Sequence, residues 1–162
     1  MKSIVYRGGV LTFRIPIHWR AGYLGIEEAT FYGDHPDSGT LRVKITTEAT
    51  PEQTQVQPAR DVLRSVVNEL SDEPVKGMAK IREDGNAIFQ YERATSGEGI
   101  SLVSFYWIVV RPLPPNRARV VTFSYTVLAE QKDCAQIRHD LEMLKAEIEA
   151  LKLSLELNEF ES

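Results

Sequence analysis

A short loop carries the residues of this chain that are best suited to acid–base chemistry. Asp34, His35 and Asp37 place an imidazole between two carboxylates, an arrangement that could act as a general base or hold a metal ion. The intervening Pro36 and the following Ser38, like Asp itself, are also the residue types that bend and cap tight connections. No third ligand or nucleophile stands at a defined spacing from the loop. We therefore favour a polar turn here over a catalytic or metal site.

Other chemically able side chains lie elsewhere in the sequence. His18 beside Trp19 could belong to a binding pocket, although a Trp that follows a strand-ending Pro more commonly closes the edge of a core. His139 lies near Met143 in a helical pattern, where a solvated imidazole is the simpler interpretation. Cys134 is the only cysteine, which excludes an intrachain disulfide and a Cys-based zinc site. The sequence therefore predicts no catalytic residue, metal ion or cofactor.

The final segment shows helical periodicity on two opposite faces. One apolar stripe has the alternating spacings of four and three that docking on a core requires: Ile137, Leu141, Leu144, Ile148, Leu151 and Leu155. The opposite stripe is weaker: Met143, Ala146, Ala150, Leu153 and Leu157. We expect a helix of about 22 residues, about 33 Å long. Because one apolar face is enough for docking, we expect Met143, Leu153 and Leu157 to contact a partner protein or a second copy of the chain, as in a homodimer.

The residues before this helix predict strands, one helix and then a meander. The expected strands are 10–15, 29–32, 41–46, 78–82, 88–94, 100–110 and 119–128, with a helix over 58–71. Short turns such as Asp84-Gly85-Asn86 join antiparallel neighbours. The pattern predicts a single α+β domain over 1–162, in which helices flank an antiparallel sheet and the long C-terminal helix packs on it.

Two neighbouring strands of the meander suggest a surface that could receive a peptide. Phe105, Tyr106 and Trp107 are consecutive and so point alternately to the two faces of the sheet. On the next strand, hydroxyl-bearing residues share one face: Thr122, Ser124 and Thr126. An aromatic strand beside a hydroxyl-bearing strand predicts a shallow groove, with Phe105 and Trp107 contacting the partner. A sheet that is simply half exposed would show the same pattern.

The charge distribution argues against nucleic acid as a partner. The net charge is −4, and residues 138–162 hold three Lys or Arg against seven Asp or Glu, so the rest of the chain is balanced. An acidic end and a neutral body give no electrostatic attraction for phosphate backbones. No apolar run is long enough for a signal peptide or a bilayer span. We therefore expect a cytoplasmic protein without membrane insertion.

Three local patterns resemble the Mog1/PsbP-like superfamily, and together they extend over nearly the whole chain. Residues 13–19 (FRIPIHW) look like its strand that ends in Pro and is followed by Trp. Residues 40–43 (TLRV) precede a helix and a meander, and residues 148–155 (IEALKLSL) are similar to its closing helix. The superfamily includes a nuclear-transport factor, photosystem extrinsic subunits, a bacterial lipoprotein group and adaptor chaperones of type VI secretion effectors. The resemblance implies an α/β/α arrangement and a non-enzymatic binding role, and it carries over no functional residue.

The leading hypothesis is thus a non-enzymatic protein-binding or adaptor module, similar to a chaperone that shields an apolar segment of a client. One alternative is a small-ligand-binding protein of the helix-grip type, in which a C-terminal helix closes a cavity over a curved sheet. The least favoured alternative is a hydrolase-type enzyme that uses Asp34, His35 and Asp37.

Overall fold

Two antiparallel sheets and a helix make up the part of the chain that the computed structural model describes, namely residues 1–6, 9–23, 28–34, 38–49, 77–81, 86–113 and 117–153. The helix expected over 58–71 lies outside these residues. The elements in chain order are β1 (Lys2–Tyr6), β2 (Leu11–Ile15), β3 (Arg20–Tyr23), β4 (Glu28–Tyr32), β5 (Thr40–Ala49), β6 (Met78–Ile81), β7 (Ala87–Gly97), β8 (Ile100–Leu113), β9 (Arg117–Leu128), a 3₁₀ turn η2 (Ala129–Gln131), α2 (Ala135–Glu149) and β10 (Lys152–Leu153).

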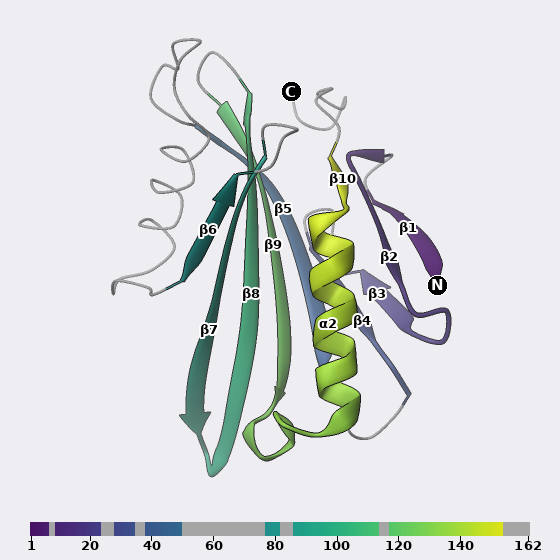
Figure 1. Cartoon of the computed structure of the whole chain (residues 1–162), viewed down its shortest axis with the longest axis vertical. Helices are drawn as coiled ribbons and strands as arrows, with labels where there is room; N and C mark the ends of the chain where they lie inside the picture. The colour runs from purple at the N-terminus through teal and green to yellow at the C-terminus, as the bar shows by residue number, and fades with distance from the viewer. Residues whose placement is uncertain are drawn as a thin grey trace.

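The large sheet has the strand order β3-β4-β5-β9-β8-β7-β6, and every neighbouring pair is antiparallel. The strands β7, β8 and β9 form the meander that the sequence predicts. Figure 1 shows α2 crossing in front of this sheet, beside the small sheet of β1, β2 and β10. The predicted α+β class, an antiparallel sheet with the C-terminal helix packed on it, is confirmed.

Alternation of buried and half-buried residues over 121–127 of β9 explains why the helix covers one face of the large sheet. Val121, Phe123, Tyr125 and Val127 are buried, whereas Thr122, Ser124 and Thr126 between them are only half buried. Successive side chains of a strand point to opposite faces, so the apolar set lies on the α2 side. There it shares one core with Ile137, Leu144 and Ile148 of α2 and with Phe13 of β2.

The last helix is shorter than the sequence predicts. It ends at Glu149, Leu151 is buried, and the chain then extends so that Lys152 pairs with Thr12 and Leu153 with Leu11. The prediction of a helix continuing to Leu157 is therefore wrong, and Leu153 belongs to a strand rather than to a helix face. The open edge of β2 gives the backbone of residues 152 and 153 a strand partner, and this pairing competes successfully with helix propensity. Leu157 lies outside the described residues.

An ion pair fixes α2 to the small sheet. Arg14 of β2 donates from Nε and from a terminal nitrogen to the two carboxylate oxygens of Glu147, at 3.0 and 2.7 Å. This bidentate geometry holds two planar groups in one orientation, and the neighbouring carboxylate raises the pKa of Arg14. The described helix is not long and apolar enough to cross a membrane.

Candidate functional site

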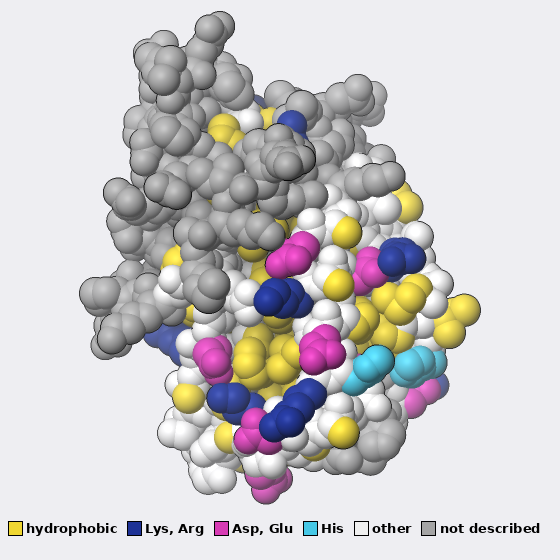
Figure 2. All heavy atoms as spheres, viewed as in Figure 1, with side chains coloured by type: hydrophobic (Ala, Val, Ile, Leu, Met, Phe, Trp, Pro, Cys, Tyr) yellow, Lys and Arg dark blue, Asp and Glu magenta, His cyan; other side chains and the backbone are white. Residues whose placement is uncertain are grey.

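A pocket of about 740 Å³ lies between α2 and the loops that follow β2 and β4. We call it the helix pocket. Its lining comes from four segments: Met1; Pro16, Ile17, His18 and Trp19; Gly33, Asp34 and Ser38; and Gln136, His139, Asp140 and Met143. On this face of the molecule the histidine side chains gather beside an apolar patch (Figure 2). The structure thus brings His18 and Trp19 together with His139 and Met143, more than a hundred residues later in the chain.

Helical spacing explains why α2 supplies four lining residues. Gln136, His139, Asp140 and Met143 stand at positions i, i+3, i+4 and i+7, which fall on one side of a helix. Met143 is half buried against the core, and His139 is exposed. The partner-contact prediction for Met143 therefore concerns a residue of the pocket wall, while Leu153 is in β10.

Asp140 is the buried charged residue of the pocket. Its side chain is 2% exposed. The Tyr125 hydroxyl donates to Oδ2 and the Gln136 amide donates to Oδ1, both at 2.9 Å. Within the described residues no Lys or Arg pairs with Asp140, so neutral donors alone stabilise its carboxylate.

Tyr125 connects this carboxylate to the loop before β5. Its hydroxyl oxygen accepts a hydrogen bond from the Gly39 N–H at 3.1 Å. Burial and the negative charge of Asp140 raise the pKa of Tyr125 far above its usual value, because both disfavour a phenolate. A Cβ on Gly39 would overlap the Tyr125 ring, so glycine allows the backbone to approach the hydroxyl.

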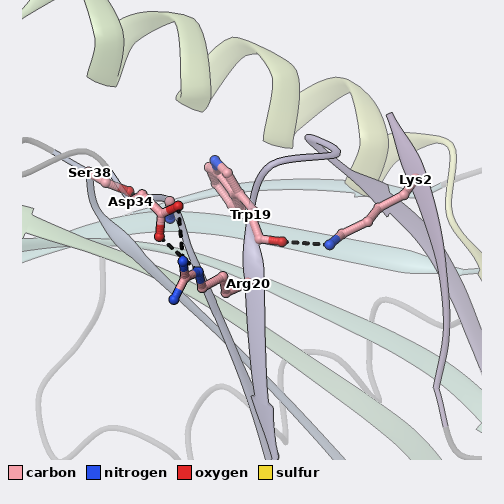
Figure 3. Close-up of polar contacts among 6 residues, drawn as sticks. Lys2, Trp19, Arg20, Asp34 and Ser38 are labelled. Atoms are coloured by element: carbon pink, nitrogen blue, oxygen red, sulfur yellow. Dashed lines mark hydrogen bonds and ion pairs between the residues drawn. The ribbon is translucent and has the colours of Figure 1, made fainter.

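Trp19 forms the floor of the pocket. The ring is 2% exposed and lies parallel to Tyr125, with centroids 6.2 Å apart. In Figure 3 it points toward α2, while Lys2 reaches its backbone carbonyl with a hydrogen bond of 2.5 Å. The Trp19 N–H also bonds to the carbonyl of Pro16 at 3.1 Å, which closes the turn after β2. Trp19 therefore closes a core edge, as expected, and lines a pocket as well.

Asp34 is held by an exposed ion pair rather than by catalytic partners. Arg20 Nε lies 2.9 Å from Asp34 Oδ1, and both side chains are largely exposed (Figure 3). The Ser38 hydroxyl accepts from the Gly33 N–H and donates to the Gly39 carbonyl, so it is occupied by its own loop. The other two members of the predicted loop site, His35 and Asp37, lie outside the described residues. Within the described part of the chain, His, Cys, Asp and Glu form no group of three able to hold a metal ion.

The rim of the helix pocket is apolar and accessible. Ile17 is 71% exposed and Met1 is 51% exposed. Large exposed apolar side chains elsewhere in the described residues are scattered over strands: Val5, Tyr23, Tyr32, Ile100 and Leu128. Apart from these seven, the described residues include no other large exposed apolar side chain, and α2 contributes none. Ile17 and Met1 are therefore the large exposed apolar side chains that line the helix pocket.

The face assignment of the aromatic strand is corrected by the register. Phe105 pairs with Tyr125 and Trp107 with Phe123, so both lie on the face that α2 covers. Trp107 is 3% exposed, which leaves its ring almost no accessible surface. Tyr106, opposite Ser124, is the aromatic residue on the hydroxyl-bearing face. Three consecutive aromatic residues fit either assignment, and only the pairing decides between them.

That opposite face has a shallow depression of about 510 Å³ with a mainly hydroxyl lining. Ser104 and Thr126 share a hydrogen bond of 2.8 Å across β8 and β9, and Tyr106 stacks on Tyr91 with centroids 4.7 Å apart. These contacts occupy much of the polar and aromatic surface of this face. The helix pocket, with its buried carboxylate and exposed apolar rim, is the stronger candidate site.

No protein-family model and no curated protein matches the sequence. Solved structures that share its fold include the following three. A protein of Bacteroides thetaiotaomicron VPI-5482 has a TM-score of 0.64 at 16% identity over 94% of this chain, which spans only 48% of that protein. LpqN of Mycobacterium tuberculosis, involved in cell envelope biogenesis, has a TM-score of 0.61 at 15% identity, with 89% and 83% of the two chains covered.

The third is the Saccharomyces cerevisiae Ran-binding protein Mog1p, with a TM-score of 0.58 at 10% identity and 94% of each chain covered. Identities this low establish the fold and leave the function open. The expected resemblance is confirmed at the level of the fold, and the chain has a Mog1-like α+β architecture. The closing-helix pattern over 148–155 is not confirmed, because α2 ends at Glu149.

Proposed function

We propose that this chain is a non-enzymatic protein-binding module whose helix pocket receives a segment of a partner protein. The observation that carries the proposal is an exposed apolar rim, Ile17 and Met1, around a pocket with a preformed wall. Apolar side chains on a rigid surface are a common basis of protein recognition. The fold is compatible with such a role, since Mog1p is a Ran-binding protein.

Hydrogen bonds within the protein hold both walls of the pocket. Two hydrogen bonds hold the Trp19 segment, one from Lys2 and one to Pro16. On the other side, Asp140 is fixed by two donors. A preformed site loses less conformational entropy on binding than a mobile one. The volume of about 740 Å³ is in the range of pockets that bind ligands of several residues or drug size.

The polar groups of the lining favour binding over catalysis. A nucleophile needs a base within hydrogen-bond reach, whereas the Ser38 hydroxyl is bonded to the backbone of Gly33 and Gly39. The exposed carboxylate of Asp34 is engaged with Arg20. Among the described lining residues, therefore, no side chain has the paired geometry of an activated nucleophile.

Site-specific photo-crosslinking in the source cell tests the proposal. Ile17 is replaced by benzoylphenylalanine, and Val5, another exposed apolar residue, is replaced in a matched control because it lies in β1 and does not line the pocket. We expect a protein adduct from position 17 and none from position 5. An adduct of twice 18.3 kDa would identify a second copy of the chain as the partner. No adduct at position 17, or equal adducts at both positions, would overturn the proposal.

A further inference from the structure

The depression of about 510 Å³ on the other face of the large sheet owes its form to the strand register. We call it the outer depression, and its floor includes Ser104, Ser124 and Thr126. Ser124 of β9 stands between two larger side chains, because it pairs with Arg42 of β5 on one side and with Tyr106 of β8 on the other. The strands β5 and β8 lie about 10 Å apart, since each is one strand spacing from β9. A small residue between two large ones leaves a hollow one strand wide.

Arg42 gives the outer depression a positive charge without an internal counter-ion. It is exposed, and it is the only Asp, Glu, Lys, Arg or His among the described lining residues. No described residue forms an ion pair or a hydrogen bond with its side chain. Arg93, also exposed, lies opposite Ser104 on β7 and adds positive charge beside the depression. A guanidinium stays charged at every physiological pH, so the depression favours an anionic ligand.

Tyr106 offers one face of its ring to the same space. Its other face stacks on Tyr91 of β7, with centroids 4.7 Å apart and planes 8° from parallel. This separation matches the spacing of neighbouring strands, so the two rings stand side by side across the sheet and the free face of Tyr106 is turned toward Ser124. A ligand ring in contact with Tyr106 at about 4 Å leaves about 6 Å to β5. One ring therefore fits between Tyr106 and Arg42.

Hydroxyl groups on the floor define the ligand further. Ser104 and Thr126 bond to each other at 2.8 Å, whereas within the described residues the hydroxyls of Thr40 and Ser124 have no partner. Each hydroxyl can donate one hydrogen bond and accept two, which matches the hydroxyl groups of a sugar. A fatty acid would place methylene groups over this polar floor, and a phosphate ion alone would leave the ring of Tyr106 without a contact.

We propose that the outer depression binds a sugar that carries a carboxylate, such as a hexuronate. Arg42 donates two parallel hydrogen bonds to the carboxylate, and a C–H face of the pyranose lies on the free face of the Tyr106 ring. The sugar hydroxyls exchange hydrogen bonds with Thr40 and Ser124. This site is separate from the proposed function, because the described linings of the two pockets share only Ser38.

The first experiment follows amide chemical shifts of the full chain during titration at constant ionic strength. The probe is methyl β-D-glucuronide, compared with methyl β-D-glucoside, which lacks the charge, and with acetate, which lacks the ring. We expect saturable shifts confined to the amides of residues 40–42, 104–106 and 124–126, with the glucoside and acetate each at least about tenfold weaker. Equal binding of the glucoside, equal binding of acetate, or shifts that are absent or lie elsewhere would each overturn the inference.

Arg42→Gln tests the charge at an exposed position, where the core is unaltered. It should weaken binding of the glucuronide about 10- to 100-fold, as expected for loss of a charge-assisted contact. Lys44→Gln is the matched control, because Lys44 is an exposed residue on the same face of β5 that does not line the depression. It should change binding by no more than about twofold. Equal losses in the two variants would indicate unspecific attraction and refute the inference.

Ser124→Val tests the hollow independently of the charge. The added methyl groups fill the space between Tyr106 and Arg42 and remove a hydroxyl, so binding should weaken at least about tenfold. Thr122→Val makes a similar change two residues away on the same face of β9, outside the described lining, and should bind like the unaltered protein. Unchanged binding in a folded Ser124→Val variant would refute the inference.

Discussion

Replacing Tyr125 with Phe removes one hydroxyl that serves two buried groups at once. The hydroxyl donates to Asp140 Oδ2 at 2.9 Å and accepts from the Gly39 N–H at 3.1 Å. Phenylalanine keeps the ring and its stacking on Trp19. The variant therefore measures the hydrogen bonds with little change in apolar packing.

The magnitude follows from the two partners. A hydrogen bond to a charged group contributes about 1.5–3 kcal/mol, and a buried N–H left without its acceptor costs about 1 kcal/mol. The free energy of unfolding should fall by about 2–4 kcal/mol, which lowers Tm on the order of 10 °C in a domain of this size. Urea denaturation followed by circular dichroism provides the measurement.

Tyr106→Phe is the matched control for this change. It deletes the same hydroxyl from a strand residue on the opposite face, where Tyr106 is half buried and stacks on Tyr91. We expect an effect within about 0.5 kcal/mol, as for a surface substitution. If both variants lose the same stability, or if Tyr125→Phe loses less than the control, the Tyr125–Asp140 contact does not stabilise the pocket wall and the reasoning fails.

Three further predictions concern the same structure. Burial beside Asp140 raises the pKa of Tyr125 in the folded protein. The stability that Tyr125 contributes is therefore complete below its pKa in the unfolded chain, near 10, and falls by about 1.4 kcal/mol per pH unit above that value. The free energy of unfolding of Tyr125→Phe should lack this dependence on alkaline pH, and an unchanged slope would contradict the assignment. Gly39→Ala should lower the free energy of unfolding by about 1–3 kcal/mol, because the added Cβ overlaps the Tyr125 ring. Gly97→Ala is the control, since the space around Gly97 is open. Equal chemical-denaturation midpoints of the two variants would disprove the close approach of Gly39 to Tyr125. Leu151→Ala should cost about 2–4 kcal/mol because the side chain is buried after the helix end, while a loss below about 0.5 kcal/mol would indicate an exposed residue.

Local patterns in the sequence are enough to predict the meander and most strands. Alternation in β9 and the short turns around β8 specify antiparallel neighbours, and the structure pairs them in this way. The end of α2 could not be predicted in the same way, because the spacing of Leu151, Leu153 and Leu155 fits an alternating strand as well as a helical stripe. Its outcome depends on the free edge of β2, about 140 residues away in the chain.

The candidate site was only partly visible in the sequence. His18, Trp19, His139 and Met143 could each be noted, but nothing in their spacing shows that they line one pocket. By helical spacing, Asp140 falls on a charged flank beside the apolar stripe. The position of Asp140 indicates its burial, because it stands three residues after Ile137 and four before Leu144, which are both buried. A carboxylate on that side of a helix requires hydrogen-bond donors within the protein.

The pairing of β10 with β2 has a consequence for how the protein is made. The helix pocket combines residues 1, 16–19, 33, 34 and 38 with four residues between 136 and 143, and the short ladder of Lys152 and Leu153 lies beyond both in the sequence. A ribosome that has synthesised only the first 130 residues has produced one wall of the pocket and not the other. Long-range closure of this kind is a late event in folding. Binding competence would then be acquired only after residue 153 has been synthesised, so occupancy of the pocket would report that α2 and β10 have docked on the N-terminal strands.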